Sequence, residues 1–143
     1  MKQILIILAV LMGCGPTTSP PMVERSGPDG RICRVFNDTG GNLAQYQRFR
    51  ADLAQTCDVV ELGECNSACT MLMTLPNACL LPSRRFGFHA STLNGAANEV
   101  MSAHYRAGIL QRFNDDWSQS ADIQRVTAEQ AIQLDPQLRL CPE

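Results

Sequence analysis

Residues 63–73 read GECNSACTMLM and place a serine, Ser67, between two cysteines four positions apart. The stretch follows a short apolar run at 58–62 (DVVEL) and is apolar again from Ala68 onward, so it predicts a strand that turns into a helix at Ser67. A serine side chain can project from such a turn, and the amides of the first helical turn favour a nearby anion. The stretch therefore indicates either a catalytic serine turn or a structural cysteine cluster.

Strand and helix signals alternate on both sides of this stretch. We expect strands at residues 32–37, 58–63, 78–81, 86–89 and 123–126. We expect helices at 41–55, 68–75 and 97–117, and a last one after Thr127, an N-cap whose capping box Gln130 completes. This alternation predicts an α/β fold of right-handed βαβ crossovers around a mostly parallel sheet. The strand ends DTGG (38–41) and ECNSAC (64–69) would then meet at one edge of that sheet.

A catalytic serine needs a base within hydrogen-bond reach and amides that stabilise the oxyanion. The chain has two histidines, His89 and His104, and no lysine after Lys2, which excludes a Ser–Lys dyad. His89 ends the extended stretch one crossover after Ser67, so it can return to the same edge of the sheet. His104 falls in the middle of the expected helix 97–117, where we expect a packing or surface residue. The sequence thus favours His89 as the partner of Ser67.

The chain contains seven cysteines, Cys14 and six others: Cys33, Cys57, Cys65, Cys69, Cys79 and Cys141. An even number in an exported domain favours disulfides, up to three, whose pairing the sequence leaves open. A zinc site is the competing interpretation, but Cys65 and Cys69 lack a second close pair, and histidines are few. We therefore expect disulfides, no metal and no other cofactor.

The first residues have the pattern of an export signal. Lys2 precedes an apolar run at 4–12, which is shorter than the roughly 20 residues that a membrane-spanning helix needs. Residues 11–14 (LMGC) look like a bacterial lipobox, so we expect a lipoprotein signal peptide at 1–13 and a lipid on Cys14; an ordinary signal peptide or a short anchor is the alternative.

Three parts of the chain are expected from this pattern: the signal peptide, the lipidated cysteine with a Pro/Gly-rich tether at 14–30, and one folded domain at 31–143. This organisation predicts an exported protein of the bacterial cell envelope, held at a membrane by its lipid and facing the periplasm or the exterior. Net charge is −2 and the basic residues are scattered, so no nucleic-acid partner is expected.

The order of these pieces resembles the proteolytic subunit of the Clp protease, within the broader Clp/crotonase fold. It looks closer still to bacterial periplasmic Clp-protease-like proteins. The resemblance rests on four stretches that keep their order: NDTGG (37–41), GECNSACTMLM (63–73), CLLPSRRFGFHAS (79–91) and VTAEQAIQL (126–134).

The resemblance implies a serine hydrolase of the peptidase type, with Ser67 as nucleophile and His89 as general base. It also implies an oxyanion hole formed by the N–H groups of Gly41 and Ala68. An acid that orients the histidine is expected near Gln119, which makes Asp116 and Asp122 the candidates.

The expected substrate is a peptide or protein. No ATPase partner is expected, because an exported protein meets no ATP. A non-catalytic binding lipoprotein with the same fold is the alternative. A coenzyme A-dependent acyl enzyme of the crotonase branch ranks third, because coenzyme A is a cytoplasmic cofactor.

Overall fold

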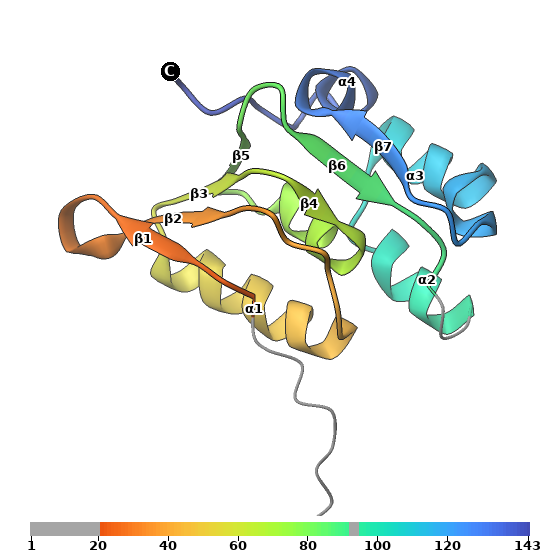
Figure 1. Ribbon diagram of the computed structural model, residues 1–143, viewed down its shortest axis with the longest axis horizontal. Coiled ribbons are helices and arrows are strands. Elements are labelled where there is room, and N and C mark those ends of the chain that lie inside the picture. Colours follow the sequence, from red (N-terminus) through yellow and green to blue (C-terminus); the bar gives the residue numbers. More distant parts are fainter. Residues whose placement is uncertain (1–20, 92–94) are drawn as a thin grey trace, which may run out of the picture.

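The computed structural model describes residues 21–91 and 95–143, which form one small mixed α/β domain (Figure 1). The strands of these residues are β1 (Glu24–Ser26), β2 (Ile32–Val35), β3 (Val59–Leu62), β4 (Cys65–Asn66), β5 (Ala78–Leu80), β6 (Arg85–Phe88) and β7 (Gln124–Thr127). They form a four-stranded sheet in the order β1-β2-β3-β5 and a three-stranded sheet in the order β4-β6-β7. A parallel bridge between Asp38 and Cys65 joins the end of the first sheet to the second.

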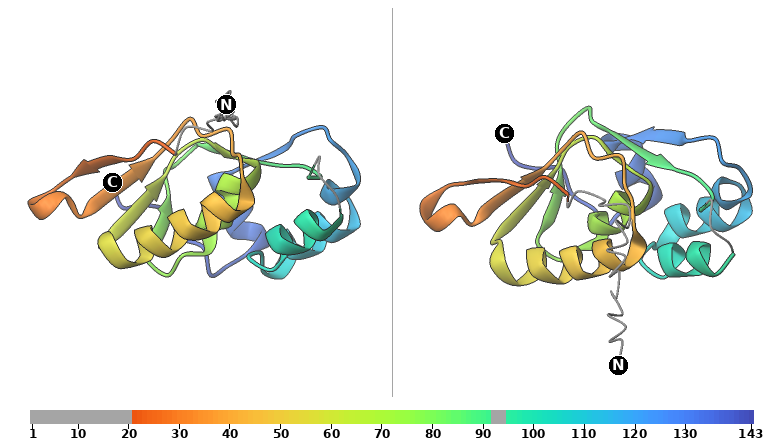
Figure 2. Two further views of the ribbon diagram at one scale, coloured as in Figure 1. Left: turned by 90° about the horizontal axis from the view of Figure 1, so that it is seen from below. Right: turned by 60° about the horizontal axis from the view of Figure 1, so that its bottom comes forward.

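The helices lie against these sheets. They are η1 (Pro28–Gly30), α1 (Leu43–Thr56), η2 (Ser67–Thr74), α2 (Gly95–Ser102), α3 (Ala107–Asp115), η3 (Trp117–Gln119) and α4 (Ala128–Leu134). Figure 2 shows α1, α2 and α3 on the same side of the strands, so that the domain has a layer of strands and a layer of helices. Asn42 caps α1 through its side chain, and Thr127 and Gln130 form the expected capping box at α4.

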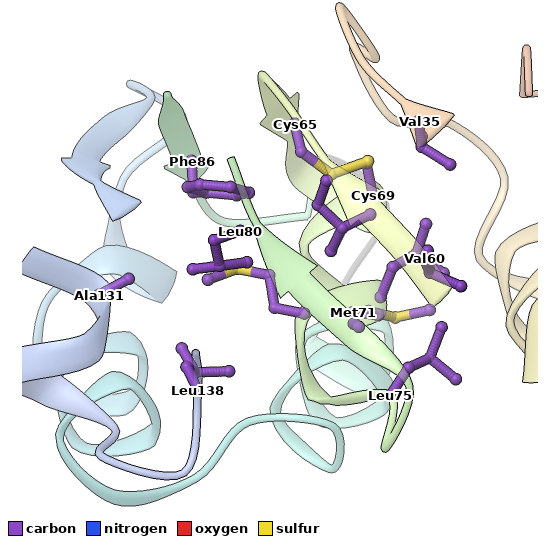
Figure 3. Close-up of a cluster of buried hydrophobic side chains, with 14 of the residues drawn as sticks. Val35, Val60, Cys65, Cys69, Met71, Leu75, Leu80, Phe86, Ala131 and Leu138 are labelled. Atoms are coloured by element: carbon purple, nitrogen blue, oxygen red, sulfur yellow. A yellow bond between two sulfur atoms is a disulfide. The ribbon is translucent and has the colours of Figure 1, made fainter. Parts of the chain in front are cut away.

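The core lies between the two layers because the strands alternate in burial. Cys33 and Val35 of β2 and Val60 and Leu62 of β3 are fully buried, while the residues between them are half-buried. Figure 3 shows part of this apolar cluster, in which η2 contributes Met71. Each fully buried large apolar side chain stabilises the fold by about 1.5–3 kcal/mol.

Six cysteines form three disulfides, which confirms the expectation from the sequence. The pairs are Cys33–Cys57, Cys65–Cys69 and Cys79–Cys141. They tie β2 to the end of α1, β4 to the first turn of η2, and β5 to the C-terminal segment. Disulfides in this number are typical of exported proteins. None of the helices described in the structure is long and apolar enough to cross a membrane.

The sheet differs from the mostly parallel one that the sequence predicts. Strands β2, β3 and β5 pair in parallel, and so do β4 and β6, but β1 and β7 are antiparallel edge strands. β1 also lies inside the expected tether. Residues 24–26 pair with β2 although they are exposed and lack an alternating apolar pattern, and Arg25 contacts Asp52 and Thr56 of α1.

The single helix expected at 97–117 is wrong, because the chain forms α2, α3 and η3 instead. The break falls at residues 103–106, where Tyr105 is buried and Arg106 is extended and pairs with the buried carboxylate of Asp135 at 3.0 Å. Gly108 in the first turn of α3 packs on α4, since a Cβ atom there would lie 2.9 Å from the Leu134 carbonyl oxygen. Tertiary contacts at Tyr105, Arg106 and Gly108 therefore override the helical pattern.

Candidate active site

Three chain segments lie side by side, run in the same direction and end at the same edge of the three-stranded sheet. Asp38 forms a parallel bridge with Cys65, and Cys65 pairs in parallel with Phe86 of β6. Two residues further along each segment, the register reaches Gly40, Ser67 and Phe88. His89 follows directly after β6 at the same edge. The structure thus brings the predicted glycine pair, serine and histidine to the ends of neighbouring strands. Neighbouring strands in a sheet lie only about 5 Å apart.

Ser67 is at the sharp turn between β4 and η2. Its φ angle is 54°, in the left-handed region that costs a residue with a side chain roughly 1–2 kcal/mol. The Cys65–Cys69 disulfide closes the turn from the end of β4 to the first turn of η2, and both sulfurs lie in the core (Figure 3). The buried Thr70 hydroxyl donates to the Ser67 carbonyl oxygen at 2.6 Å. Covalent and polar contacts therefore hold the serine in a conformation that the free chain would avoid.

A hydroxyl pair connects this turn to the helices behind it. The Thr70 and Tyr105 hydroxyls lie 2.6 Å apart in the core, and burial raises the pKa of the Tyr105 hydroxyl well above its ordinary value. Tyr105 also packs edge to face against Phe88, with ring centroids 5.4 Å apart. The break between α2 and α3, which sequence reasoning missed, thus places Tyr105 in contact with Thr70 of the serine turn.

Gly40 is the glycine that touches the serine. Its φ is +81°, and a Cβ atom there would lie 2.7 Å from Ser67 Cβ and 3.0 Å from the Ala68 nitrogen. Any side chain at this position would collide with the turn, so the residue has to be glycine. Gly41 follows it and is exposed; a Cβ atom there would meet only the Tyr46 ring, at 3.7 Å.

Asp38 organises the glycine loop, a role that sequence reasoning missed. Its carboxylate oxygen Oδ1 accepts a hydrogen bond from the Gly40 N–H at 2.8 Å and another from the Tyr46 hydroxyl of α1. Burial, and then the bond to Asp38, raise the pKa of the Tyr46 hydroxyl far above its ordinary value, so this hydroxyl stays a donor. The signal in the sequence is an aspartate two residues before a glycine, which is typical of an Asx-turn.

Two N–H groups remain for an oxyanion. Within the described residues, neither the Gly41 N–H nor the Ala68 N–H donates a hydrogen bond to a protein group. Ala68 is buried at the start of η2, where free amides point along the helix axis and favour negative charge. The predicted oxyanion pair is thus free of internal acceptors.

His89 is half-buried and has a defined orientation. Its Nδ1 atom lies 2.6 Å from the Ala90 carbonyl oxygen. A carbonyl oxygen only accepts, so the proton of the neutral ring is on Nδ1, and Nε2 is the unprotonated nitrogen that can act as a base. The Ala90 N–H donates in turn to the Ser120 carbonyl oxygen at 2.7 Å, which fixes this segment against the 118–122 region.

Among the described residues, no carboxylate forms a hydrogen bond with His89 where the resemblance places an acid. The 118–122 segment does run beside Ala90, but Asp116 and Asp122 are exposed, and no hydrogen bond of the described residues joins either carboxylate to His89. The Gln119 side chain donates to Asn114 and Ser118 instead. A backbone carbonyl, that of Ala90, occupies the place of the acid. Within the described residues there is also no hydrogen bond between Ser67 Oγ and His89.

His104 is far from the serine. It lies in the turn between α2 and α3, and its carbonyl oxygen accepts from the Thr74 hydroxyl at 2.7 Å, at the end of η2 opposite Ser67. The eight residues of η2 separate its two ends by about 14 Å. Burial and the nearby charge of Arg50 lower the pKa of the His104 imidazole. His104 is thus half-buried in a turn, not in the middle of a helix as the sequence predicts.

No cluster of metal-ligating side chains occurs in the described part of the chain. Cys14, the expected lipidation site, lies outside the described residues. Comparison with protein-family models matches no family, and no curated protein matches the sequence. The chemistry therefore has to be argued from the site itself. It combines a strained serine, an oriented imidazole and free amides at one edge, the groups that acyl transfer needs.

Proposed function

We propose that the protein is a serine hydrolase of the peptidase type, with Ser67 as nucleophile and His89 as general base. The observation that carries the proposal is the left-handed conformation of Ser67, at a strand-to-helix turn that the Cys65–Cys69 disulfide closes and Gly40 contacts. Strained backbone persists where the surroundings enforce it, and a serine raised on such a turn is the nucleophile geometry of many hydrolases.

In the proposed reaction, Ser67 Oγ attacks the carbonyl carbon of an ester or amide, and His89 Nε2 takes the hydroxyl proton. The Gly41 and Ala68 N–H groups donate to the oxyanion of the tetrahedral intermediate. The imidazolium returns its proton to the leaving group, which departs and leaves an acyl-serine. Water, with His89 again as base, then releases the acid and restores the serine.

The Ala90 carbonyl supports the imidazolium less strongly than a carboxylate would. Its hydrogen bond with Nδ1 fixes the tautomer and ring orientation, but it carries no full charge. Because the charged ring forms in each transition state, we expect slow turnover compared with a complete triad.

A Clp/crotonase-like fold and a lipid anchor on Cys14 belong to the same proposal. The parallel run of β2, β3 and β5 with α1 and η2 as crossovers supports the fold, and the disulfides support export. We expect Cys14→Ser to move the protein from the membrane to the soluble fraction or to leave it unprocessed. Unchanged membrane association with unchanged mass would rule out the anchor.

The experiment that tests the hydrolase compares the two histidines. Covalent labelling of Ser67 by a fluorophosphonate should fall about 100-fold or more in His89→Ala, because the nucleophile loses its base. His104→Ala is the matched control, and we expect it to label like the wild type. Equal labelling of all three proteins at equal thermal stability would contradict the role of His89.

A binding lipoprotein without catalysis is the second candidate. It is favoured by the lack of a hydrogen bond between Ser67 and His89 in the described residues and by the missing carboxylate behind the ring. In that case the same edge of the sheet would bind a peptide without reaction. Folded, oxidised protein that stays unlabelled over hours would favour this candidate.

A further inference from the structure

Strand β7 forms an open edge of the three-stranded sheet. Within the described residues it pairs with β6 on one side and with no strand on the other, so it lies outermost in this sheet (Figure 1). Just past the two strands, the Ala128 N–H donates to the Arg84 carbonyl oxygen at 2.9 Å. Because main-chain bonding between antiparallel strands alternates from residue to residue, the N–H and C=O of Arg125 and Thr127 face away from β6.

The outward-facing main-chain groups of Arg125 have no protein partner in the described structure. The Thr127 N–H is satisfied, since it donates to Gln130 Oε1 of the capping box at 2.9 Å. No hydrogen bond of the described residues joins the Arg125 N–H or C=O to a group beyond the edge. Arg125 therefore offers a donor and an acceptor side by side, the pair through which a sheet edge binds an extended chain.

A pocket of about 290 Å³ lies beside this edge, between β7, η3, α3 and α4. Its polar lining residues are Arg112, Arg125, Gln130 and Gln133, and its apolar ones are Trp117, Val126 and Leu134. Among the described residues, no carboxylate lines the pocket, and neither arginine belongs to an ion pair. Pockets for whole small molecules measure about 300–1,000 Å³, so this one suits side chains of a larger chain.

Two guanidinium groups without a counter-charge in the pocket select an anion. Arg112 comes from the last turn of α3 and Arg125 from β7, so the two charges reach the pocket from different elements. Guanidinium N–H groups bind carboxylate oxygens through charge-assisted hydrogen bonds. The apolar lining beside them, with Trp117, suits an apolar side chain. Side chains two positions apart in an extended chain lie on the same side, so one peptide can supply both groups.

We propose that β7 binds an acidic peptide segment of another protein as an additional strand. The peptide main chain pairs with the N–H and C=O of Arg125, and a peptide carboxylate binds the Arg112 and Arg125 side chains. An apolar side chain two positions from the carboxylate packs on Trp117. The inference does not depend on the proposed hydrolase, because β6 lies between β7 and β4, the strand that leads to Ser67.

Fluorescence anisotropy of a labelled peptide tests the recognition of charge. The probe is the end-blocked hexapeptide TVEVLT, and the matched probe TVQVLT lacks its carboxylate. We expect the full chain to bind the first peptide about tenfold more tightly than the second, and Arg112→Gln and Arg125→Gln each to weaken its binding about tenfold. Arg48→Gln removes an exposed charge from α1 and should bind like the wild type. Charges on an edge strand can also serve to repel other strands. In that case neither peptide would bind at about 1 mM, which would overturn the inference, as would equal affinity for both peptides.

N-methylation of the peptide tests the strand pairing. Successive N–H groups of an extended chain point to opposite sides, so two peptides methylated on complementary sets of alternate residues differ in which side loses its donors. We expect one of them to lose binding and the other to keep it. The fluorescence of Trp117, the single tryptophan of the chain, should change when the unmethylated peptide binds. Equal affinity of the two methylated peptides would contradict pairing with β7, and saturation with unchanged Trp117 fluorescence would contradict binding in this pocket.

Discussion

Removal of the Cys65–Cys69 disulfide should damage the site more than the fold. The bond joins residues only four positions apart, so in the chain-entropy account it restricts the unfolded chain by about 6 cal/mol/K, or about 2 kcal/mol at 25 °C. The Cys33–Cys57 bond joins residues 24 positions apart and contributes about 3.5 kcal/mol by the same account. The shorter bridge is therefore the cheaper one to lose.

The rate of Ser67 labelling should fall more on loss of the Cys65–Cys69 bridge than on loss of the Cys33–Cys57 bridge. Without its bridge, the β4–η2 turn can relax from the left-handed conformation of Ser67, which costs roughly 1–2 kcal/mol to maintain. The Cys33–Cys57 bridge instead joins β2 to the end of α1, and neither cysteine belongs to the β4–η2 turn. We expect Cys65→Ala/Cys69→Ala to lose at least tenfold in the rate of Ser67 labelling, since about 1.4 kcal/mol of misalignment corresponds to a factor of ten.

The assay pairs urea unfolding with fluorophosphonate labelling at a temperature well below both melting points. Cys33→Ala/Cys57→Ala is the matched control, because both variants remove one buried disulfide and four cysteines remain paired. The expected result is a crossover: the control is the less stable protein and the faster one to be labelled. Labelling of Cys65→Ala/Cys69→Ala at the rate of the control would refute the idea that the disulfide holds the nucleophile.

Two further substitutions test the turn. Ser67→Gly should be about 1 kcal/mol more stable than Ser67→Ala in chemical unfolding, because glycine adopts a φ of 54° without strain; equal stabilities would contradict the strain at this position. Gly40→Ala should lose about 2 kcal/mol or more and abolish labelling, because its Cβ atom would collide with Asn66 O and Ser67 Cβ, each at 2.7 Å. Gly30→Ala, with a similar positive φ and no neighbour closer than 3.7 Å, should cost only about 1 kcal/mol and leave labelling unchanged.

Local patterns in the sequence predict much of this fold. The strands at 32–37 and 58–63, the helix at 41–55 and the Thr127 capping box depend on neighbours within a few positions, and the structure has them as β2, β3, α1 and the start of α4. The paired cysteines also follow from their even number in an exported chain. The edge strand β1 does not, because an exposed three-residue strand carries no apolar alternation. The strand expected at 123–126 is present as β7, but its antiparallel pairing with β6 depends on residues far apart in the sequence.

The parts of the site that sequence reasoning missed depend on contacts between distant residues. Tyr105 reaches Thr70 across 35 positions, and the helix breaks to permit it. The absence of a carboxylate behind His89 in the described residues likewise depends on which way the 118–122 segment turns.

Peptide mapping of the intact, oxidised wild-type protein after fluorophosphonate treatment tests the central claim most directly. The hydrolase account predicts a single modified residue, Ser67, with all six cysteines of the domain still in disulfides and no label on the other serines. Fully folded protein that carries no label on Ser67 after several hours with several small phosphonates would contradict the account.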